Sequence, residues 1–290
     1  MTRVDCPQRK VSSVAMITIV SGKGAPGATT TLAALAVTWP APVLLADCDP
    51  DGGDLAPGWL GQWVLAGQLR TEVGVLSHAT ATRHAPAGDP ARLLEHVQAV
   101  PPARHVGLLA GLSATSQQGA VGVSGWTRLT VALAAFKTAS GQSADALVDA
   151  GRFGATTPWP LLLAADLVLV AVRPTTRHVL AARPVLAELG TRLASARLGL
   201  AVCATTAAGT REVRAALGRD TALEVPADAT TASALSEGMD GGALPRRSLL
   251  LRSTREAAGR LHRTYHRHNP HDLPASAPRA SAHLLAGEAR

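Results

Sequence analysis

Short, almost uniformly apolar segments recur along the chain, and they constrain its fold more than any other feature. The strand candidates are Met16–Ser21, Pro42–Asp47, His105–Ala110, Ala144–Asp149, Asp166–Val172 and Leu198–Cys203, with a shorter seventh at Ala222–Val225. Strands without alternation are typical of a parallel sheet that is covered on both faces. Helical stretches lie between them, at Thr29–Val37, Trp126–Thr138, Arg177–Leu189 and Thr210–Leu217. The alternation predicts an α/β fold: a doubly wound, mostly parallel sheet with helices on both faces.

Composition excludes several classes of protein. The 290 residues are 47% hydrophobic and 17% charged, so the chain is not wholly disordered. Three cysteines at unrelated spacings form no disulfide or zinc pattern, which fits a reducing compartment. The first residues are polar and include Asp5, so they do not resemble a secretory signal. The longest apolar stretch, Leu161–Val172, is interrupted by Asp166 and is too short to span a bilayer. We therefore expect a cytoplasmic protein.

Positive charge is concentrated at the C-terminal end. Residues 245–290 contain nine Arg and three acidic residues, which places +6 of the net charge of +7 there. Periodicity predicts a helix over 247–265 with Leu250, Thr254, Ala257, Leu261 and Tyr265 on one stripe. We expect this helix to pack on the sheet; the alternative is a surface for anionic lipid or nucleic acid. The histidines at 262, 266, 268 and 271 are interpreted as part of a solvated tail rather than as metal ligands.

A glycine-rich turn joins the first strand to the first helix. It reads S-G-K-G-A-P-G-A-T-T over residues 21–30. Such a turn directs backbone N–H groups and a helix N-terminus at one point, which suits a phosphate. The Walker A pattern G-x-x-x-x-G-K-[ST] is met by Gly22, Gly27 and Thr29, but Ala28 occupies the lysine position. By this pattern alone, a plain glycine-rich turn stays open beside a phosphate loop.

The segment Lys23-Gly24-Ala25-Pro26-Gly27-Ala28-Thr29-Thr30 resembles the deviant Walker A motif of the ParA/MinD family, K-G-G-x-G-K-T. It matches at the signature lysine, the flanking glycines and both threonines, and departs at Ala25 and Ala28. The resemblance implies ATP binding by Gly22 and all eight of these residues. It also implies that Lys23 acts catalytically by reaching across a homodimer interface to the partner's nucleotide.

Three later segments support the resemblance. Strand two ends in V-L-L-A-D-C-D-P, which resembles the family's Walker A′ element and implies Asp47 beside the Mg²⁺ shell and Asp49 orienting the attacking water. Two carboxylates just beyond a strand suit a ligand site, although a solvated acidic turn is the alternative. The run A-L-V-D resembles Walker B and implies that Asp149, with Thr29, lies near Mg²⁺. Val225-Pro226-Ala227-Asp228 resembles the adenine loop, which implies contacts from Pro226 and Asp228.

The resemblance covers roughly residues 15–262 and divides the chain into an N-terminal extension (1–14), a nucleotide-binding domain (15–265) and a basic tail (266–290). Within the family, the D-C-D-P-D-G-G-D-L-A run and the D-A-G-R step after Walker B resemble the TadZ/CpaE-type pilus-assembly branch. Arg152, in that step, is a candidate to compensate for Ala28, with an ordinary surface arginine as the alternative.

The resemblance implies an ATP-binding switch that dimerises to position or assemble cellular machinery. Because Ala28 lacks the lysine charge, we expect slow or absent hydrolysis. The alternatives are a non-catalytic scaffold of a pilus or secretion system, and a partitioning ATPase that binds DNA through residues 245–290. These imply a pilus, secretion or partitioning protein as partner, and a location at the membrane or nucleoid. No small-molecule substrate other than nucleotide is expected.

Overall fold

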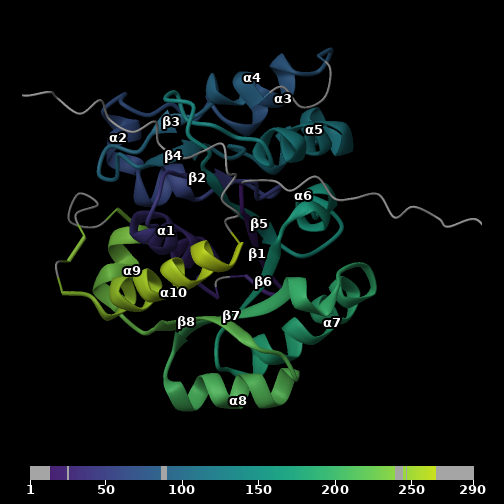
Figure 1. The fold of residues 1–290 in the computed structure, drawn as a ribbon, viewed down its shortest axis with the longest axis vertical. Coiled ribbons are helices and arrows are strands. Elements are labelled where there is room, and N and C mark those ends of the chain that lie inside the picture. Colours follow the sequence, from purple (N-terminus) through teal and green to yellow (C-terminus); the bar gives the residue numbers. More distant parts are fainter. Residues whose placement is uncertain (1–13, 25, 86–89, 239–243, 246, 266–290) are drawn as a thin grey trace, which may run out of the picture.

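One sheet forms the centre of the molecule (Figure 1). The computed structural model describes residues 14–24, 26–85, 90–238, 244–245 and 247–265. Their strands lie in the order β3-β4-β2-β5-β1-β6-β7-β8. They are β1 Met16–Ser21, β2 Val43–Asp47, β3 Gln98–Ala99, β4 Val106–Leu109, β5 Asp145–Arg152, β6 Leu167–Val172, β7 Leu198–Thr205 and β8 Thr221–Pro226. All neighbours pair in parallel except β3 with β4, which confirms the predicted fold class.

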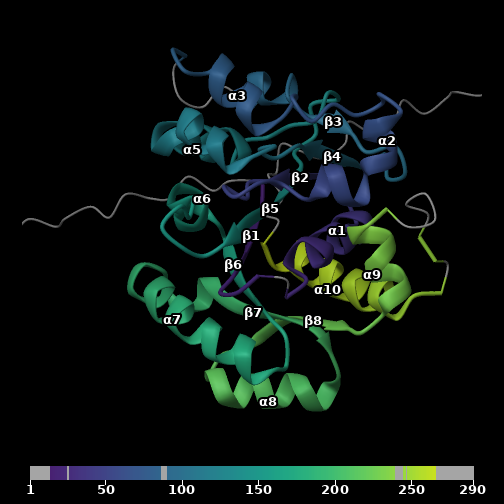
Figure 2. The same cartoon turned by 180° about the vertical axis from the view of Figure 1, so that it is seen from behind.

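Helices cover both faces of the sheet (Figures 1 and 2). One face carries α1 Ala28–Thr38, α9 Ala229–Ser236 and α10 Leu249–Tyr265. The other carries α3 Val75–Ala81, α5 Gln118–Leu133, α6 Trp159–Ala164, α7 Thr176–Arg192 and α8 Ala207–Leu217. Shorter elements are a π-helical turn at Leu55–Trp59, α2 Gly61–Leu65, α4 Pro90–Leu94, and 3₁₀ turns at Thr115–Gln117 and Ser195–Arg197. Among these described helices, none is long and apolar enough to cross a membrane.

The strand β1 shows why the sheet is buried on both sides. Ile17 and Ile19 pack in the core under α1, whereas Met16 and Val20 pack in the core on the opposite face. All six residues of β1 are buried. A strand with apolar side chains toward both faces is stable only between two layers of helices, so its sequence needs no polar alternation.

The seven predicted strands are all present, and the predicted helices differ mainly at their ends. The helix expected at Trp126–Thr138 begins at Gln118, with a break at Gly122, and ends at Leu133. Lys137 instead forms an antiparallel bridge with Ser143. The helices α6 and α9 were not predicted, although prolines at the start of α6 and the Asp228 N-cap of α9 are signals for them.

The last helix packs as expected. Its predicted stripe is buried at Leu250, Thr254, Ala257 and Leu261 and half-buried at Tyr265. These residues face α1 and β8, and the helix therefore belongs to the domain core.

The interpretation of His262 as part of a solvated tail is wrong. His262 Nδ1 lies 2.7 Å from Asp145 Oδ2, and Trp39 Nε1 donates to the same oxygen at 3.0 Å. The Asp145 side chain is only 1% exposed, so these contacts hold the end of α10 against the start of β5. The histidines at 266, 268 and 271 lie outside the described residues, as do residues 1–13 of the predicted extension.

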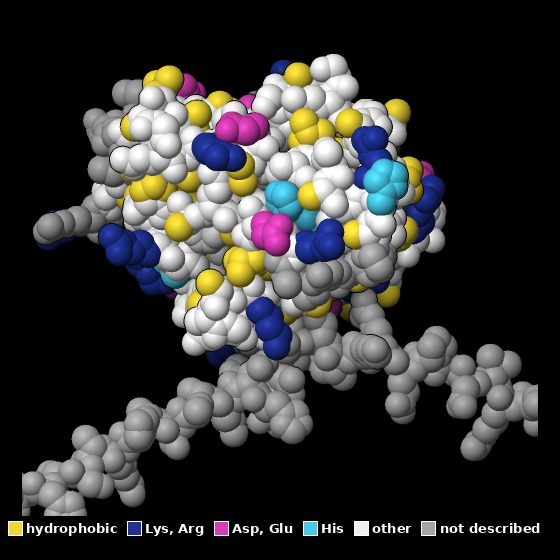
Figure 3. Space-filling model, turned by 90° about the horizontal axis from the view of Figure 1, so that it is seen from above, with side chains coloured by type: hydrophobic (Ala, Val, Ile, Leu, Met, Phe, Trp, Pro, Cys, Tyr) yellow, Lys and Arg dark blue, Asp and Glu magenta, His cyan; other side chains and the backbone are white. Residues whose placement is uncertain are grey.

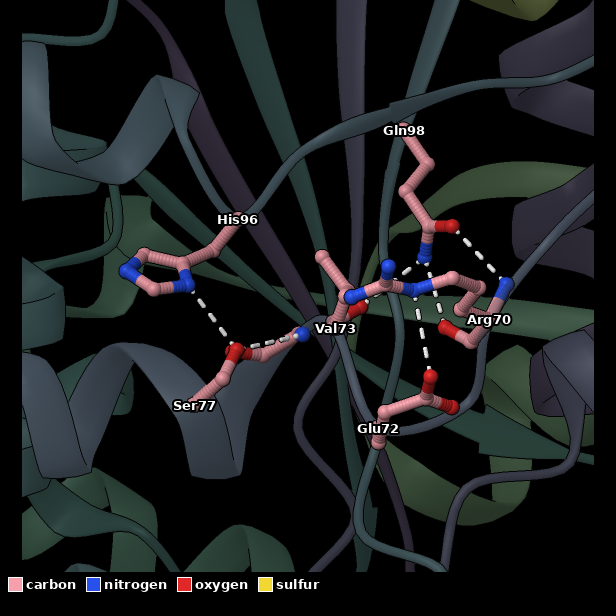
Figure 4. Close-up of polar contacts among 7 residues, drawn as sticks. Arg70, Glu72, Val73, Ser77, His96 and Gln98 are labelled. Carbon is pink, nitrogen blue, oxygen red and sulfur yellow. Dashed lines mark hydrogen bonds and ion pairs between the residues drawn. The ribbon is translucent and has the colours of Figure 1, made fainter.

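Residues 52–104, in which periodicity placed no helix, are organised by side-chain contacts (Figure 4). The amide of Gln98 accepts from Arg70 N at 2.8 Å and donates to the carbonyl oxygens of Arg70 and Val73 at 2.8 and 2.9 Å. Ser77 Oγ lies 2.8 Å from His96 Nδ1 and accepts from Gly74 N. They connect the segments that follow the short helices α2 and α4 with α3 and the strand β3, elements that lie in this range and that periodicity did not locate.

Candidate nucleotide site

Strand order brings the predicted site residues together. In the register of the sheet, β1 lies between β5 and β6, with Ile19 opposite Asp149 and Ser21 opposite Ala171. On the other side of β5, Asp47 of β2 lies opposite Asp149. Because these strands are parallel, their carboxyl ends meet at one edge, where ligands bind in open α/β sheets.

The turn between β1 and α1 has the backbone geometry of an anion site. Gly27 adopts a left-handed conformation with φ 96°, which favours glycine, and it precedes the first residue of α1. No side chain caps this helix N-terminus among the described residues, and its first three residues, Ala28, Thr29 and Thr30, line the adjoining cavity. Ala25 lies outside the described residues.

Two adjoining cavities lie against this turn. The larger has a volume of about 770 Å³ and is lined by the turn, by acidic residues and by two arginines: Ser21, Gly24, Pro26, Gly27, Ala28, Thr29, Thr30, Asp49, Asp54, Pro57, Gly58, Asp149, Gly151, Arg152, Arg173, Leu235, Ser236 and Glu237. The smaller, of about 260 Å³, has mostly apolar walls from the ends of β7 and β8 and from α9 and α10. Pro26, Gly27, Thr30 and Arg173 line both. A polar cavity thus continues into an apolar one, as a nucleotide requires.

The predicted magnesium residues Thr29 and Asp149 are in contact. The Thr29 hydroxyl donates to Asp149 Oδ2 at 2.6 Å, and Gly151 N donates to Asp149 Oδ1 at 2.9 Å. Gly151 has φ 67°, and a Cβ there would collide with the Asp49 carboxylate. The glycine in the D-A-G-R step therefore allows Asp49 to approach the end of β5.

The two aspartates after β2 occupy different positions. Asp49 is half-buried and lines the larger cavity, and its Oδ1 accepts from Asp51 N at 2.8 Å. Asp47 is 1% exposed and does not line the described cavity; its Oδ2 accepts from Leu55 N at 3.0 Å. The structure places Asp47 behind the cavity wall, where it holds the loop that follows β2.

Burial and mutual repulsion shift these carboxyl groups toward their protonated forms. Burial, with repulsion from Asp149, raises the pKa of Asp47 to about 8. Burial raises the pKa of Asp49 to about 6, and burial also raises the pKa of Asp149 against the opposing hydrogen bonds from Thr29 and Gly151. A cluster of this kind gains stability when a cation neutralises it.

The donor set fits Mg²⁺ when phosphate and water complete the shell. The Thr29 hydroxyl and the Asp49 and Asp149 carboxylates are hard oxygen ligands at one end of the cavity. Among the described residues, no group of three or more His, Cys, Asp or Glu side chains is arranged to hold a metal alone. Mg²⁺ in proteins commonly retains several waters and is bound through one or two carboxylates together with phosphate oxygens.

The cations around the turn differ in their placement. Lys23 is exposed and does not line the described cavities. Arg152, the compensating cation suggested by the sequence, lines the larger cavity. Arg173 was missed by sequence reasoning, although it directly follows β6, the neighbour of β1. Asp54 and Glu237 also line the cavity and were missed: Asp54 lies in the D-C-D-P-D-G-G-D-L-A run without a predicted role, and no motif marks Glu237.

The predicted base-loop residues line the smaller cavity, but Asp228 is engaged elsewhere. Pro226 and Asp228 both contribute to its wall. The Asp228 carboxylate accepts from Thr231 N and Oγ1 at 3.2 and 2.9 Å and from Ser248 Oγ at 2.7 Å. It thereby joins the start of α9 to the start of α10.

Sequence comparison alone finds no relative of this chain. No family model matches it, and no curated protein does. Solved structures do match. A ParA family ATPase from Chlorobium tepidum superimposes with a TM-score of 0.65 at 16% identity, covering 85% of this chain and 98% of that chain.

The chain has the fold of the ParA and MinD ATPases. A chain of the MinC:MinD cell division protein complex of Aquifex aeolicus matches with a TM-score of 0.61 at 17% identity, covering 86% of this chain and 95% of that chain. The septum site-determining protein MinD of Pyrococcus horikoshii, complexed with Mg-ADP, matches with a TM-score of 0.60 at 16% identity, covering 87% and 97%. The ParA/MinD resemblance of the motifs is thus confirmed at the level of the fold.

Proposed function

We propose that this protein binds ATP with Mg²⁺ and acts as a nucleotide-dependent switch that positions or assembles cellular machinery. The observation that carries the proposal is the pair of adjoining cavities at the β1–α1 turn. Backbone N–H groups and the Thr29–Asp149 pair lie in the polar cavity, and the apolar cavity beside it suits a base. The same fold binds Mg-ADP in the Pyrococcus horikoshii MinD, which supports a nucleotide as the ligand.

Dimerisation through Lys23 is part of the proposal. The resemblance to the ParA/MinD motif implies that this lysine acts on the nucleotide of the partner subunit. In this chain the Lys23 side chain is exposed and lines neither described cavity. A lysine of that kind can reach a second copy without leaving its own site incomplete. The MinC:MinD complex of Aquifex aeolicus supports a protein partner for a chain of this fold.

Slow or absent hydrolysis is proposed from Ala28. Ala28 lines the cavity but carries no charge, so the charge that normally bridges β- and γ-phosphates is absent from this position. Asp49 lines the same cavity and is the residue proposed to orient an attacking water. The chemistry that Mg²⁺ supplies when bound is neutralisation of phosphate charge.

A non-catalytic scaffold of a pilus or secretion system is the second candidate. Ala28 favours it, as does the D-A-G-R step of the TadZ/CpaE-type branch, in which Gly151 makes room for Asp49. The scaffold binds nucleotide without turnover, so a steady-state phosphate-release assay separates it from an ATPase.

The exposed arginines of α10 favour an anionic surface as a further contact. Arg252, Arg255, Arg260 and Arg263 are all exposed on the side away from the core. By contrast, the face that Figure 3 shows carries basic and acidic side chains interspersed. DNA or lipid binding through residues 245–290 would place the protein at the nucleoid or membrane, and its affinity should fall steeply with salt.

Calorimetry with ATP and Mg²⁺ tests the main proposal. We expect saturable binding of one nucleotide per chain that weakens when Mg²⁺ is removed. No heat of binding at millimolar nucleotide, where a functional site would be saturated, would overturn it. Binding of DNA and of anionic vesicles, titrated with salt in the full chain and in a chain lacking 245–290, tests the arm separately.

A further inference from the structure

The site lacks one positive charge that a phosphate chain needs. Ala28 is the first residue of α1 and only 7% exposed, so the helix N-terminus offers partial charges alone. The larger cavity is lined by four acidic side chains (Asp49, Asp54, Asp149 and Glu237) and by two arginines. A cation of this chain close to the turn would therefore favour a nucleotide here, in addition to the proposed Mg²⁺.

Arg173 is placed to provide that cation. It follows β6 directly, and β6 pairs with β1 next to the turn. Arg173 Nε donates to the carbonyl oxygen of Pro26 at 3.1 Å, which holds the guanidinium against the turn. Among the described residues, no other hydrogen bond to the Arg173 side chain is present, so both of its terminal guanidinium nitrogens are available. These two nitrogens can bind two oxygens of one phosphate.

The position of Arg173 also indicates which phosphate it would meet. Of the charged residues that line the described cavities, Arg173 alone lines both the polar and the apolar one. With the base in the apolar cavity, the junction is reached by the inner phosphates, and the γ-phosphate extends toward Thr29 and Asp149. Arg152 lines only the polar cavity, so it is less well placed for this contact.

We propose that Arg173 binds the α- or β-phosphate of the nucleotide and supplies part of the positive charge that Ala28 lacks. This inference rests on the proposed nucleotide site. The proposed role of Arg173 differs from that of a lysine at position 28, which would bridge the β- and γ-phosphates and would favour ATP over ADP. Because Arg173 contacts an inner phosphate, it stabilises bound ADP and ATP alike.

The test is calorimetric titration of ADP and ATP, both with Mg²⁺. We expect Arg173→Ala to weaken both nucleotides to a similar degree, by about 10- to 150-fold, the usual loss for a charge-assisted contact. Arg173→Lys should restore part of the affinity, since lysine keeps the charge but not the paired geometry. Arg177→Ala is the matched control: Arg177 is exposed at the start of the next helix and lines neither cavity, so its effect should stay within about twofold.

A second variant separates charge from a structural role. If Arg173 acts through its charge, adding Ala28→Lys to Arg173→Ala should recover part of the lost affinity. The inference would be overturned if Ala28→Lys strengthened nucleotide binding in the parent chain but restored no affinity when added to Arg173→Ala. Equal affinity of Arg173→Ala and the parent chain would overturn it too, with the nucleotide site intact. Absence of binding by the parent chain would instead overturn the proposed function and this inference together.

Discussion

The Thr29 hydroxyl donates a hydrogen bond of 2.6 Å to Asp149 Oδ2, which joins the first turn of α1 to the carboxyl end of β5. The two residues are 120 positions apart in the sequence. Their contact brings the predicted phosphate turn and the predicted Walker B strand together at the wall of one cavity. It also presents a hydroxyl and a carboxylate together at the end of the polar cavity.

Thr29→Ala should weaken Mg-ATP binding by about tenfold or more, because it removes a hydroxyl that contacts a charged group. Thr29→Ser keeps the hydroxyl and should bind nearly as well as the parent chain. Titration calorimetry with and without Mg²⁺ measures this. A similar loss in both conditions would contradict a role of the hydroxyl at the metal.

Lys23→Ala should abolish ATP-dependent dimerisation while one chain still binds nucleotide, because the Lys23 side chain is exposed and lines neither described cavity. Light scattering after size exclusion, in ATP and in ADP, measures the mass. Lys137→Ala is the matched control, since Lys137 is also exposed but follows α5. Dimers of undiminished stability in Lys23→Ala would refute the role in trans.

Ala28→Lys should increase both ATP affinity and phosphate release, because it restores a charge at the end of the turn where Ala28 lines the cavity. Ala28→Met is a control of similar length without the charge. A coupled phosphate assay with calorimetry on the same samples measures both. An unchanged rate in Ala28→Lys would show that the missing lysine does not limit hydrolysis.

Asp228→Ala should destabilise the fold by about 1–3 kcal/mol, since the carboxylate caps α9 and holds Ser248 ahead of α10. Burial raises the pKa of Asp228, but hydrogen bonds from Ser248 and Thr231 outweigh it, so the net pKa is lowered. The contribution of the Asp228 carboxylate to folding stability is therefore complete above the ordinary pKa near 3.8 and is lost as pH falls below that value.

Denaturant unfolding measures the effect of Asp228→Ala. Asp220→Ala is the control, because Asp220 is an exposed residue whose ion pair with Arg214 should contribute less than about 1 kcal/mol. A nucleotide-binding defect in Asp228→Ala without any loss of stability would instead indicate a direct contact with the base.

Acid should destabilise the protein through His78, whose side chain is 1% exposed. Burial, together with repulsion from His96 and Arg128, lowers the pKa of His78 from 6.5 to about 4. At His78 the folded state then binds fewer protons than the unfolded state, so the contribution of this residue to stability is complete above pH 6.5 and falls as pH drops toward 4. The loss should reach about 3 kcal/mol.

Unfolding midpoints across this pH range measure the effect. Relative to the parent chain, His78→Leu should lose less stability as pH falls from 6.5 to 4, whereas His84→Ala, at an exposed site, should follow the parent profile. The raised pKa values of Asp47 and Asp49 act in the opposite direction, but equally in all three chains. Burial also lowers the pKa of His96, so a smaller slope should persist in His78→Leu. A pH profile identical to that of the parent chain would contradict the assignment to His78.

The sequence alone determined the strands and the turn, because both depend on local patterns. Ile17 and Ile19 point to one face of β1, and Met16 and Val20 point to the other, so this almost uniformly apolar strand requires helices on both faces. Gly27 is followed directly by the helix α1, and glycine is the residue that adopts a left-handed conformation easily. Burial of apolar side chains and backbone freedom are properties of a residue and its neighbours, so they can be seen before the fold is known.

Only the tertiary structure decided which distant residues meet. Asp149 contacts Thr29 because β5 inserts beside β1, and Arg173 reaches Pro26 because β6 lies on the other side of β1. Likewise, His262 joins Asp145 because α10 crosses back over the start of β5, although its sequence context is that of a basic tail. Strand order is set by the packing of the whole chain, and no local pattern encodes it.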